Sequence, residues 1–453
     1  MEAGPHFSLS PTYLFTSRHG DADCLHCTVQ PDDSTSAVLI AEDEFSIQYV
    51  TPGSGVAGDY IADTFRLDGI TLKNLTLAVA TEAESVTTGI MGIGFSSGES
   101  WVAEGGDAYP NIIDVMVSEN LINTRAYSLY LDDLQADTGI ALFGGYDKAK
   151  YSGDLGLLEI QPDEESGTIS SMTVAWTSFG VTDPSGMTTF LTDSDFVSPA
   201  VLDSGTTFTF LPQDLFDQIA KFSQAVNDNE YGYIVSCANM SAYGGSLSYG
   251  FGGAGGPIIT VPFSELAVPA LDEDGNPLTF DAGEAACLFG LFPGEDDSPI
   301  LFGDTFLRSA YVTYDLDNEV IGIAQTLFNT TDSDIHAIGS QGVQAIASTA
   351  SVASVTAQAT ATGVAAPGNS VGATSSGSGT TVTAIGHASA VGAGGLHGVS
   401  TSQGPIPTHN AGTATSASTS ATHTGAANVV LVQQDSFSVS LAVWGLLVGF
   451  ALF

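Results

Sequence analysis

A long tract without charged side chains divides this sequence. Between Ser340 and Gln434 there is no Asp, Glu, Lys or Arg, and Ala, Ser, Thr, Gly and Val predominate. Such a tract cannot bury enough varied apolar side chains to offset the entropy lost on ordering, so we expect a disordered stalk over 329–436, suited to O-glycosylation. The globular part must therefore lie before the stalk, and the residues up to about Gln325 are enough for two packed lobes.

The charge of the chain is strongly acidic. Its 51 Asp and Glu against 8 Lys and Arg give a formal charge of −43. This excess argues against binding to nucleic acid or to anionic membrane surfaces. It suits a protein working in acid, where many carboxylates become neutral. A solubilising surface would explain it equally well, and charge alone does not choose between them.

Short runs rich in Val, Ile, Thr, Tyr and Phe predict an all-β body with few short helices. Gly, Asp and Asn clusters separate these runs. Only NIIDVMVSENLI and PQDLFDQIAKFSQAV have the periodicity of amphipathic helices. The predicted strands lie in DEFSIQYV, DTFRLDGITLKNLTLAVAT, AYSLYLDD, GIALFGG, SSMTVAWTSFGVT and AYVTYDLDNEVIGIAQT.

One stretch, PAVLDSGTTFTFLP from Pro199 to Pro212, places Asp203 on a tight Ser-Gly turn directly after an apolar run. The only other Asp in a similar tripeptide is Asp137, in QADTGIALFGG, which precedes an ordinary strand and is interpreted as structural. An internal similarity joins TTGIMGIGF (87–95) to SPILFGDTFL (298–307), since both contain two apolar residues followed by Gly. Two duplicated β lobes would produce this similarity, and so would chance.

Several stretches in this order resemble the pepsin-like aspartic proteases, particularly the fungal glycosylphosphatidylinositol-anchored kind. The similarity runs from about Cys24 to Thr326. It implies a two-lobed peptidase domain at 23–328, with lobes at about 23–160 and 161–328. It rests on FSIQYVTPGSGVAGDYIADTF (the flap hairpin), TTGIMGIGF, YPNIIDVMVSENLINTRAYSLYLDD, TGIALFGGYDKAKYSGDL, AVLDSGTTFTFLP and ILFGDTFLRSAYVTYDLDNEVIGIA.

The resemblance implies a catalytic role for Asp203, as the second of two carboxyl groups that hold one water and share a proton in acid. Ser204 would then brace the two catalytic loops across the turn at Gly205, and Thr206 would hydrogen-bond the carboxylate. Tyr49, on the flap, would close over a polypeptide substrate; the alternative for Tyr49 is a cross-strand packing role. No cofactor or metal is expected, and we expect a monomer.

The first catalytic Asp of this family is missing from the sequence. Nothing in the first 48 residues has two apolar residues followed by Asp-Thr-Gly, and Asp21 and Asp23 in HGDADC lack that context. The opening MEAGPHFSLSPTYLFTSRHG is also not a signal peptide. We therefore expect residues 1–22 to be atypical or spurious, the first lobe to be incomplete, and the chain as written to be an inactive piece of an acid-acting aspartic endopeptidase. The alternatives are an inactive homologue that binds peptides, and a wall-anchored structural or adhesion protein.

The four cysteines fall into two groups. Cys237 and Cys287 both belong to the second lobe of the resemblance and are predicted to form a disulfide. Cys24 and Cys27 form a Cys-x-x-Cys pair, for which we favour a disulfide over half of a zinc site or a redox motif.

The C-terminus has the parts of a lipid attachment signal. Val439–Phe453 is an uncharged apolar end, short for a membrane span, within a predicted signal at 437–453. A spacer at 428–438 and the small residues Gly425-Ala426-Ala427 precede it, as in glycosylphosphatidylinositol signals. We expect attachment near Gly425 and a location at the cell surface or wall; a retained tail anchor is the alternative. Three glycosylation acceptors, which also favour the secretory route, are Asn74, Asn239 and Asn329.

Overall fold

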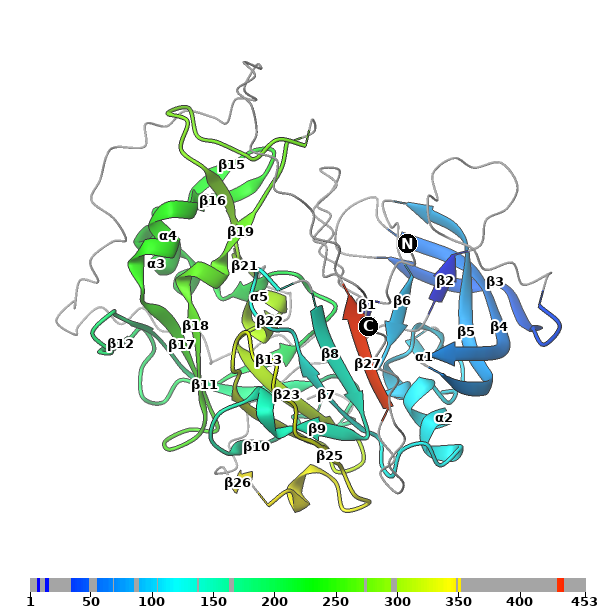
Figure 1. Cartoon of the computed structure of the whole chain (residues 1–453). Helices are drawn as coiled ribbons and strands as arrows, with labels where there is room; N and C mark the ends of the chain where they lie inside the picture. The colour runs from blue at the N-terminus through cyan, green and yellow to red at the C-terminus, as the bar shows by residue number, and fades with distance from the viewer. Residues whose placement is uncertain are drawn as a thin grey trace.

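The computed structural model consists mainly of β-sheets, arranged in a blue-to-cyan group and a green group with a middle sheet that joins them (Figure 1). It describes residues 6–8, 13–15, 34–48, 55–67, 69–84, 89–103, 105–136, 138–162, 167–272, 275–294, 300–347, 349–351 and 430–435.

The first-lobe sheet has six strands in the order β1-β6-β2-β5-β4-β3. Strands β3, β4 and β5 form an antiparallel meander, while β1 runs parallel to β6 and β2 runs parallel to β5. Helix α2 packs against β5. The elements are β1 (His6–Ser8), β2 (Tyr13–Phe15), β3 (Val38–Gln48), β4 (Gly55–Leu67), β5 (Ile70–Glu84), β6 (Ile90–Gly92), η2 (Ser96–Gly98), α1 (Ser100–Ala103) and α2 (Ile112–Ser118).

The middle sheet draws strands from distant parts of the chain, in the order β26-β10-β24-β23-β7-β8-β27. A separate two-stranded sheet pairs β9 with β25. The elements are β7 (Ala126–Tyr130), β8 (Thr138–Phe143), β9 (Gly145–Asp147), η3 (Lys148–Lys150), β10 (Leu155–Glu159), β23 (Ala310–Asp315), β24 (Val320–Gln325), β25 (Ile335–Ala337), η5 (Val343–Ala345), β26 (Thr349–Ser351) and β27 (Val430–Asp435).

The second lobe contains an eight-stranded sheet, ordered β18-β17-β11-β13-β22-β14-β21 with β12 paired to β11, and a four-stranded sheet, ordered β15-β16-β20-β19. Its strands are β11 (Thr173–Thr182), β12 (Thr188–Phe190), β13 (Ser198–Leu202), β14 (Thr209–Leu211), β15 (Val226–Asp228), β16 (Gly232–Ser236), β17 (Ser246–Phe251), β18 (Ile258–Pro262), β19 (Ala267–Pro269), β20 (Ala286–Phe289), β21 (Leu291–Pro293) and β22 (Leu301–Phe302). Its helices are α3 (Gln213–Ser223), α4 (Cys237–Tyr243), η4 (Phe263–Leu266) and α5 (Asp304–Leu307).

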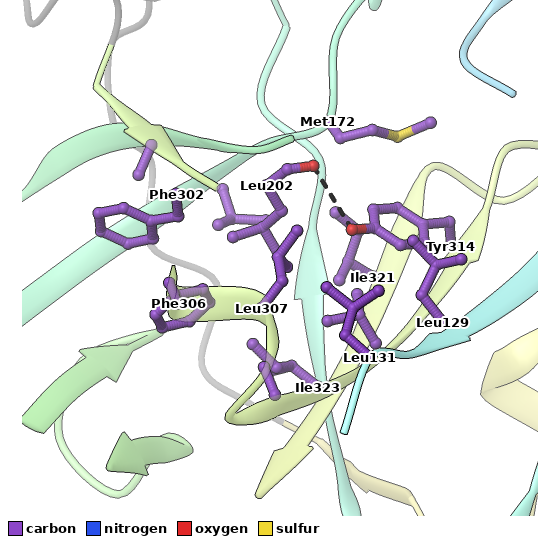
Figure 2. Close-up of a cluster of buried hydrophobic side chains, with 14 of the residues drawn as sticks. Leu129, Leu131, Met172, Leu202, Phe302, Phe306, Leu307, Tyr314, Ile321 and Ile323 are labelled. Carbon is purple, nitrogen blue, oxygen red and sulfur yellow. Dashed lines mark hydrogen bonds between the residues drawn. The ribbon is translucent and has the colours of Figure 1, made fainter. Parts of the chain in front are cut away.

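One continuous hydrophobic core joins the sheets. Figure 2 shows part of it, in which Leu129 of β7 and Ile321 of β24 belong to the same buried cluster as Leu202 of β13 and Phe306 of α5. Because these side chains come from the middle sheet and from the second lobe, burying them fixes the position of the strand that ends at Leu202.

The β-rich architecture and the two amphipathic helices predicted from sequence are confirmed. Helix α2 begins with a capping box, in which the Asn111 side chain accepts from the Asp114 N–H and the Asp114 side chain accepts from the Asn111 N–H. Helix α3 follows Pro212 and ends where Gln224 adopts a left-handed conformation. Among the described residues, none of the helices has the length and hydrophobicity needed to cross a lipid bilayer.

Part of the segment expected to form a disordered stalk, residues 329–347 and 349–351, is folded and packs on the body, with β25, η5 and β26 inside it. Ile338, Val343 and Ile346 are buried beside the aromatic cluster of β23. The Val343 N–H donates to Asp315 Oδ2 at 2.8 Å, which holds this segment against the middle sheet. These apolar side chains are too few to alter the average composition of the tract, so composition alone did not reveal them.

Two further observations concern segments near the ends of the sequence. Strands β1 and β2 lie inside the segment 1–22 and belong to the first-lobe sheet, and the expectation that this segment is atypical stays a prediction. Strand β27 lies inside the predicted stalk, and it pairs antiparallel with β8 over Val430–Asp435.

Candidate active site

Asp203 directly follows β13, a strand of five buried residues. Its N–H donates to the Phe302 carbonyl of β22 at 3.1 Å, so the parallel pairing of the two strands continues into the turn. The chain then reverses, and the Thr206 N–H donates to the Asp203 carbonyl at 3.3 Å. The sequence Asp-Ser-Gly-Thr folds in this way because a short polar turn must lead out of a buried strand.

Two hydrogen bonds hold the Asp203 carboxyl group. The Gly205 N–H donates to Oδ1 at 2.8 Å, and the Thr206 hydroxyl donates to Oδ2 at 2.6 Å. Asp203 is only 9% exposed. Burial raises the pKa of Asp203 above its ordinary value, while the bonds from Thr206 and Gly205 act in the opposite direction. This carboxyl group therefore keeps its proton to a higher pH than an exposed Asp, a property suited to general acid–base chemistry.

Two stacked tyrosines lie behind the turn. The Tyr314 hydroxyl donates to the Leu202 carbonyl at 3.4 Å (Figure 2), and the Tyr314 ring stacks on Tyr127 with 4.8 Å between centroids. Burial, and then the charge of Asp203, raise the pKa of Tyr314. Both rings therefore stay neutral and add no charge beside the turn.

A second carboxyl group, that of the half-buried Asp304, lies beside the same turn. Its N–H donates to the Thr206 carbonyl at 2.8 Å. Burial raises the pKa of Asp304 to about 7; Arg308 lowers this pKa, and Asp203 raises it further. The Arg308 side chain is 3% exposed, and its Nε has no hydrogen-bond partner among the described residues. Asp304, in ILFGDTF, has no role that the sequence alone predicts, because its position depends on the pairing of β22 with β13.

The other predicted site residues are placed only in part. Ser204 and Gly205 are partly exposed at the turn. Strands β3 and β4 form an antiparallel hairpin, with Gln48 opposite Gly55, in the stretch that resembles the flap, but Tyr49 lies outside the described residues. So do Asp137, Cys24, Cys27 and Gly425. Within the described residues, no three His, Cys, Asp or Glu side chains gather as a metal site would require.

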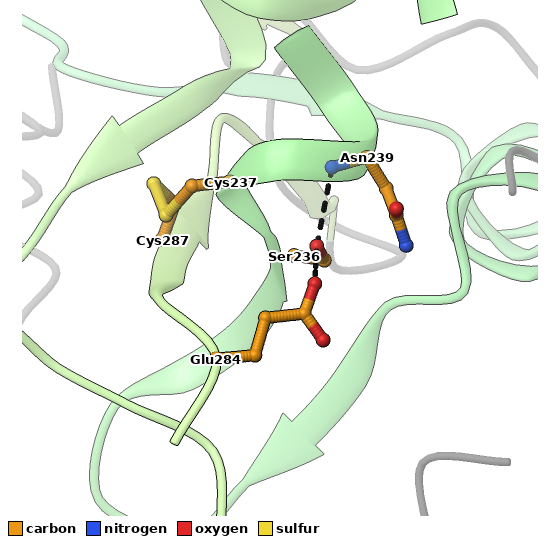
Figure 3. Close-up of a disulfide and its surroundings, with 5 residues drawn as sticks. All are labelled: Ser236, Cys237, Asn239, Glu284 and Cys287. Atoms are coloured by element: carbon orange, nitrogen blue, oxygen red, sulfur yellow. Dashed lines mark hydrogen bonds between the residues drawn. A yellow bond between two sulfur atoms is a disulfide. The ribbon is translucent and has the colours of Figure 1, made fainter. Parts of the chain in front are cut away.

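The predicted disulfide between Cys237 and Cys287 is present, with 5.2 Å between the Cα atoms (Figure 3). It joins the first residue of α4 to β20. Next to it, the Ser236 hydroxyl donates to Glu284 and accepts from the Asn239 N–H at 3.2 Å, which caps the helix (Figure 3). The disulfide lies in the second lobe, in the layer that carries β15, β16, β19 and β20.

The three glycosylation acceptors differ in accessibility. Asn74 is exposed within β5 and has a left-handed backbone, with φ at 55°. Asn239 is half-buried in α4. Asn329 is exposed, and its side-chain amide donates to the Asp133 carboxylate.

Comparison with known proteins agrees with a pepsin-like fold around this turn. The model of the family described as eukaryotic aspartyl protease matches residues 14–326, and the chain belongs to this family. An aspartic proteinase from Irpex lacteus superposes with a TM-score of 0.54 over 72% of this chain and 91% of that structure, at 19% identity, which supports the fold.

Curated relatives include fungal proteins with related names. The probable aspartic-type endopeptidase opsB of Aspergillus oryzae is 37% identical over 68% of this chain and 60% of its own length. Secreted aspartic protease 8 of Candida albicans is 34% identical over 68% of this chain and 65% of its own length. An acid protease of Saccharomycopsis fibuligera is 34% identical over 65% of this chain and 71% of its own length. The chain thus spans about 60% of the length of the opsB relative.

Proposed function

We propose that Asp203 is one of the two carboxyl groups of an aspartic-type endopeptidase site and that polypeptides are its substrates. The observation that carries the proposal is the buried Asp203 carboxyl group, fixed by the Gly205 N–H and the Thr206 hydroxyl. Membership in the aspartyl protease family supports the same chemistry. Ser204 and the flap residue Tyr49 would assist by bracing the turn and by covering the bound peptide.

Hydrolysis at such a site requires a second carboxyl group. One ionised carboxylate takes a proton from water while the water oxygen bonds to the peptide carbon, and the protonated partner donates to the carbonyl oxygen. The C–N bond then breaks as the first carboxyl group passes its proton to the leaving amine and the second takes a proton back from a hydroxyl of the tetrahedral intermediate. Asp304 is not that partner, since it lies on the same lobe with its backbone bonded to Thr206. We therefore expect the chain as given to bind peptides without cleaving them.

Pepstatin binding and peptide hydrolysis test this proposal together. The purified chain should bind pepstatin at pH 4 and show only background cleavage of a fluorogenic peptide. Asp203→Asn, a near-isostere, should weaken pepstatin binding at least tenfold while the melting temperature stays within a few degrees. Pepstatin-sensitive cleavage by the unchanged chain would show that a second carboxyl group is already in place. Absence of binding would favour a structural or adhesive wall protein instead.

We also propose an extracellular location with lipid attachment near Gly425. The three-part C-terminal signal supports it, as does the similarity to Secreted aspartic protease 8 of Candida albicans. Phospholipase treatment of intact cells should release the protein, and its peptide map should lack Phe453. A protein that stays on the cells and retains the Phe453 peptide would instead be tail-anchored.

A further inference from the structure

The Asp203 turn of the second lobe lies among four strands, β13, β22, β14 and β21, with a defined register. Strand β13 runs parallel to β22, with Val201 opposite Leu301 and Leu202 opposite Phe302. Strand β14, which follows the turn, runs antiparallel to β22 and parallel to β21. Asp203 is the residue after β13, and Gly303 is the residue after β22. The parallel register therefore places Asp203 opposite Gly303.

The first lobe repeats these strand directions with β1, β6, β2 and β5, although β2 meets its central strand at Ile90, one position earlier than the place at which β14 meets Phe302. Strand β1 runs parallel to β6, and β2 runs antiparallel to β6 and parallel to β5. The central strands also share a pattern, because β6 reads Ile-Met-Gly and β22 with its next residue reads Leu-Phe-Gly. Gly92 of the first lobe thus corresponds to Gly303 of the second.

The register then identifies one residue. In the first lobe, His6, Phe7 and Ser8 stand opposite Ile90, Met91 and Gly92. Since Asp203 is level with Gly303, the residue that stands opposite Gly92 holds the equivalent place.

We propose that Ser8 holds the first-lobe position equivalent to Asp203, and that Ser8→Asp completes the pair of carboxyl groups. This inference rests on the proposed role of Asp203. A serine hydroxyl stays neutral across the acidic range, so it offers neither a general base nor a shared acidic proton. Two Asp residues at equivalent positions of the two lobes would repel as anions, and one would hold a proton while the other stays ionised.

Gain of hydrolysis is the first test. Ser8→Asp should raise cleavage of a fluorogenic peptide at pH 4 at least 100-fold above background, within the usual range for general acid–base groups. The matched control Ser8→Asn should stay at background, because its amide does not titrate. The double variant Ser8→Asp/Asp203→Asn should lose the gain. Equal cleavage by Ser8→Asp and Ser8→Asn, with both folded by circular dichroism, counts against the proposal.

A second test needs no activity and separates the position of Ser8 from the function of Asp203. Melting temperatures of the unchanged chain, Ser8→Asp, Asp203→Asn and the double variant are measured from pH 3 to pH 8. If the two positions face each other, Ser8→Asp destabilises the fold as pH rises, and Asp203→Asn removes much of that loss. Such coupling without hydrolysis would support the position and overturn the proposed function. Additive effects at every pH would overturn the position itself.

Discussion

At the scale of single residues, opposing influences act on Asp203. Burial favours the neutral acid, whereas the Gly205 N–H and the Thr206 hydroxyl favour the carboxylate. Thr206 is fully buried, so its hydroxyl has no water to bind if this bond is lost. The pKa of Asp203 therefore depends on one side chain three residues away.

Replacing Thr206 with Val should reduce stability in a pH-dependent way. Loss of the hydroxyl removes the bond to Oδ2 and raises the pKa of Asp203 further, which penalises the ionised form. We expect a loss of about 1–2 kcal/mol at pH 7 and a smaller loss at pH 3, where the carboxyl group is protonated. Thermal or urea unfolding at the two pH values measures this. Thr206→Ser keeps the hydroxyl, so its unfolding free energy should stay close to that of the unchanged chain. An equal loss of stability in both variants would show that packing, rather than the hydrogen bond, causes the effect.

The sequence predicts some of these residues and not others, for physical reasons. Asp203 and Thr206 lie within one turn, whose chemistry is written in consecutive residues. Asp304 comes near that turn only through strand pairing, so no local pattern identifies it. The position of Ser8 depends on the register of β1 with β6, and a serine outside any recognisable catalytic motif does not indicate a catalytic position in the sequence.

At the scale of elements, the second lobe relies on a covalent link between two short pieces. Helix α4 has seven residues, too few to be stable alone, and the Cys237–Cys287 disulfide ties its first turn to β20. Short helices such as α4 were not predicted, because their stability comes from caps and tertiary contacts rather than from periodicity. Helices α2 and α3 were predicted because apolar residues recur along each of them at the spacing of one helix face.

Removing this disulfide should destabilise the second lobe. The cysteines are 50 residues apart, and closing a loop of that size stabilises a fold by about 4 kcal/mol through the unfolded state. The Cys237→Ala/Cys287→Ala variant should lose that order of unfolding free energy, measured by urea unfolding. Adding a thiol reductant to the unchanged chain should lower its midpoint as well, and reductant should have little further effect on the double variant. An unchanged midpoint in the variant would contradict this prediction.

At the scale of the whole molecule, several buried acids make the fold sensitive to pH. Burial raises the pKa of Glu99 to about 8 and that of Glu265 to about 7. The Tyr109 hydroxyl donates to Glu99 at 3.0 Å and partly offsets the burial. A group whose folded pKa is raised binds its proton more tightly when folded. Its contribution to stability is thus complete below the unfolded value near 4.5 and declines as pH rises toward 8.

The protein should therefore be more stable at pH 4 than at pH 7.5, and Glu99→Gln should reduce that difference. The Gln carbonyl can still accept from Tyr109, and the variant avoids the cost of keeping Glu99 protonated in the fold, up to about 3 kcal/mol at pH 7, where the unfolded chain ionises this group. Melting temperatures should rise for this variant at pH 7.5 and change little at pH 4. Glu82→Gln, at an exposed site in β5, is the control and should be nearly neutral at both. An equal rise in melting temperature for Glu99→Gln and Glu82→Gln would show that the change in net charge, rather than the burial of Glu99, causes the effect.

The pairing of β27 with β8 has a consequence for maturation. Attachment of a lipid near Gly425 would remove Val430–Asp435, the residues that pair with Thr138–Phe143. The precursor would thus cover its own sheet edge, and processing would uncover a row of backbone N–H and C=O groups on β8. An uncovered edge of this kind accepts an extended segment from another chain. The processed protein would then be able to join its neighbours on the cell surface edge to edge, while the precursor inside the cell stays apart from them.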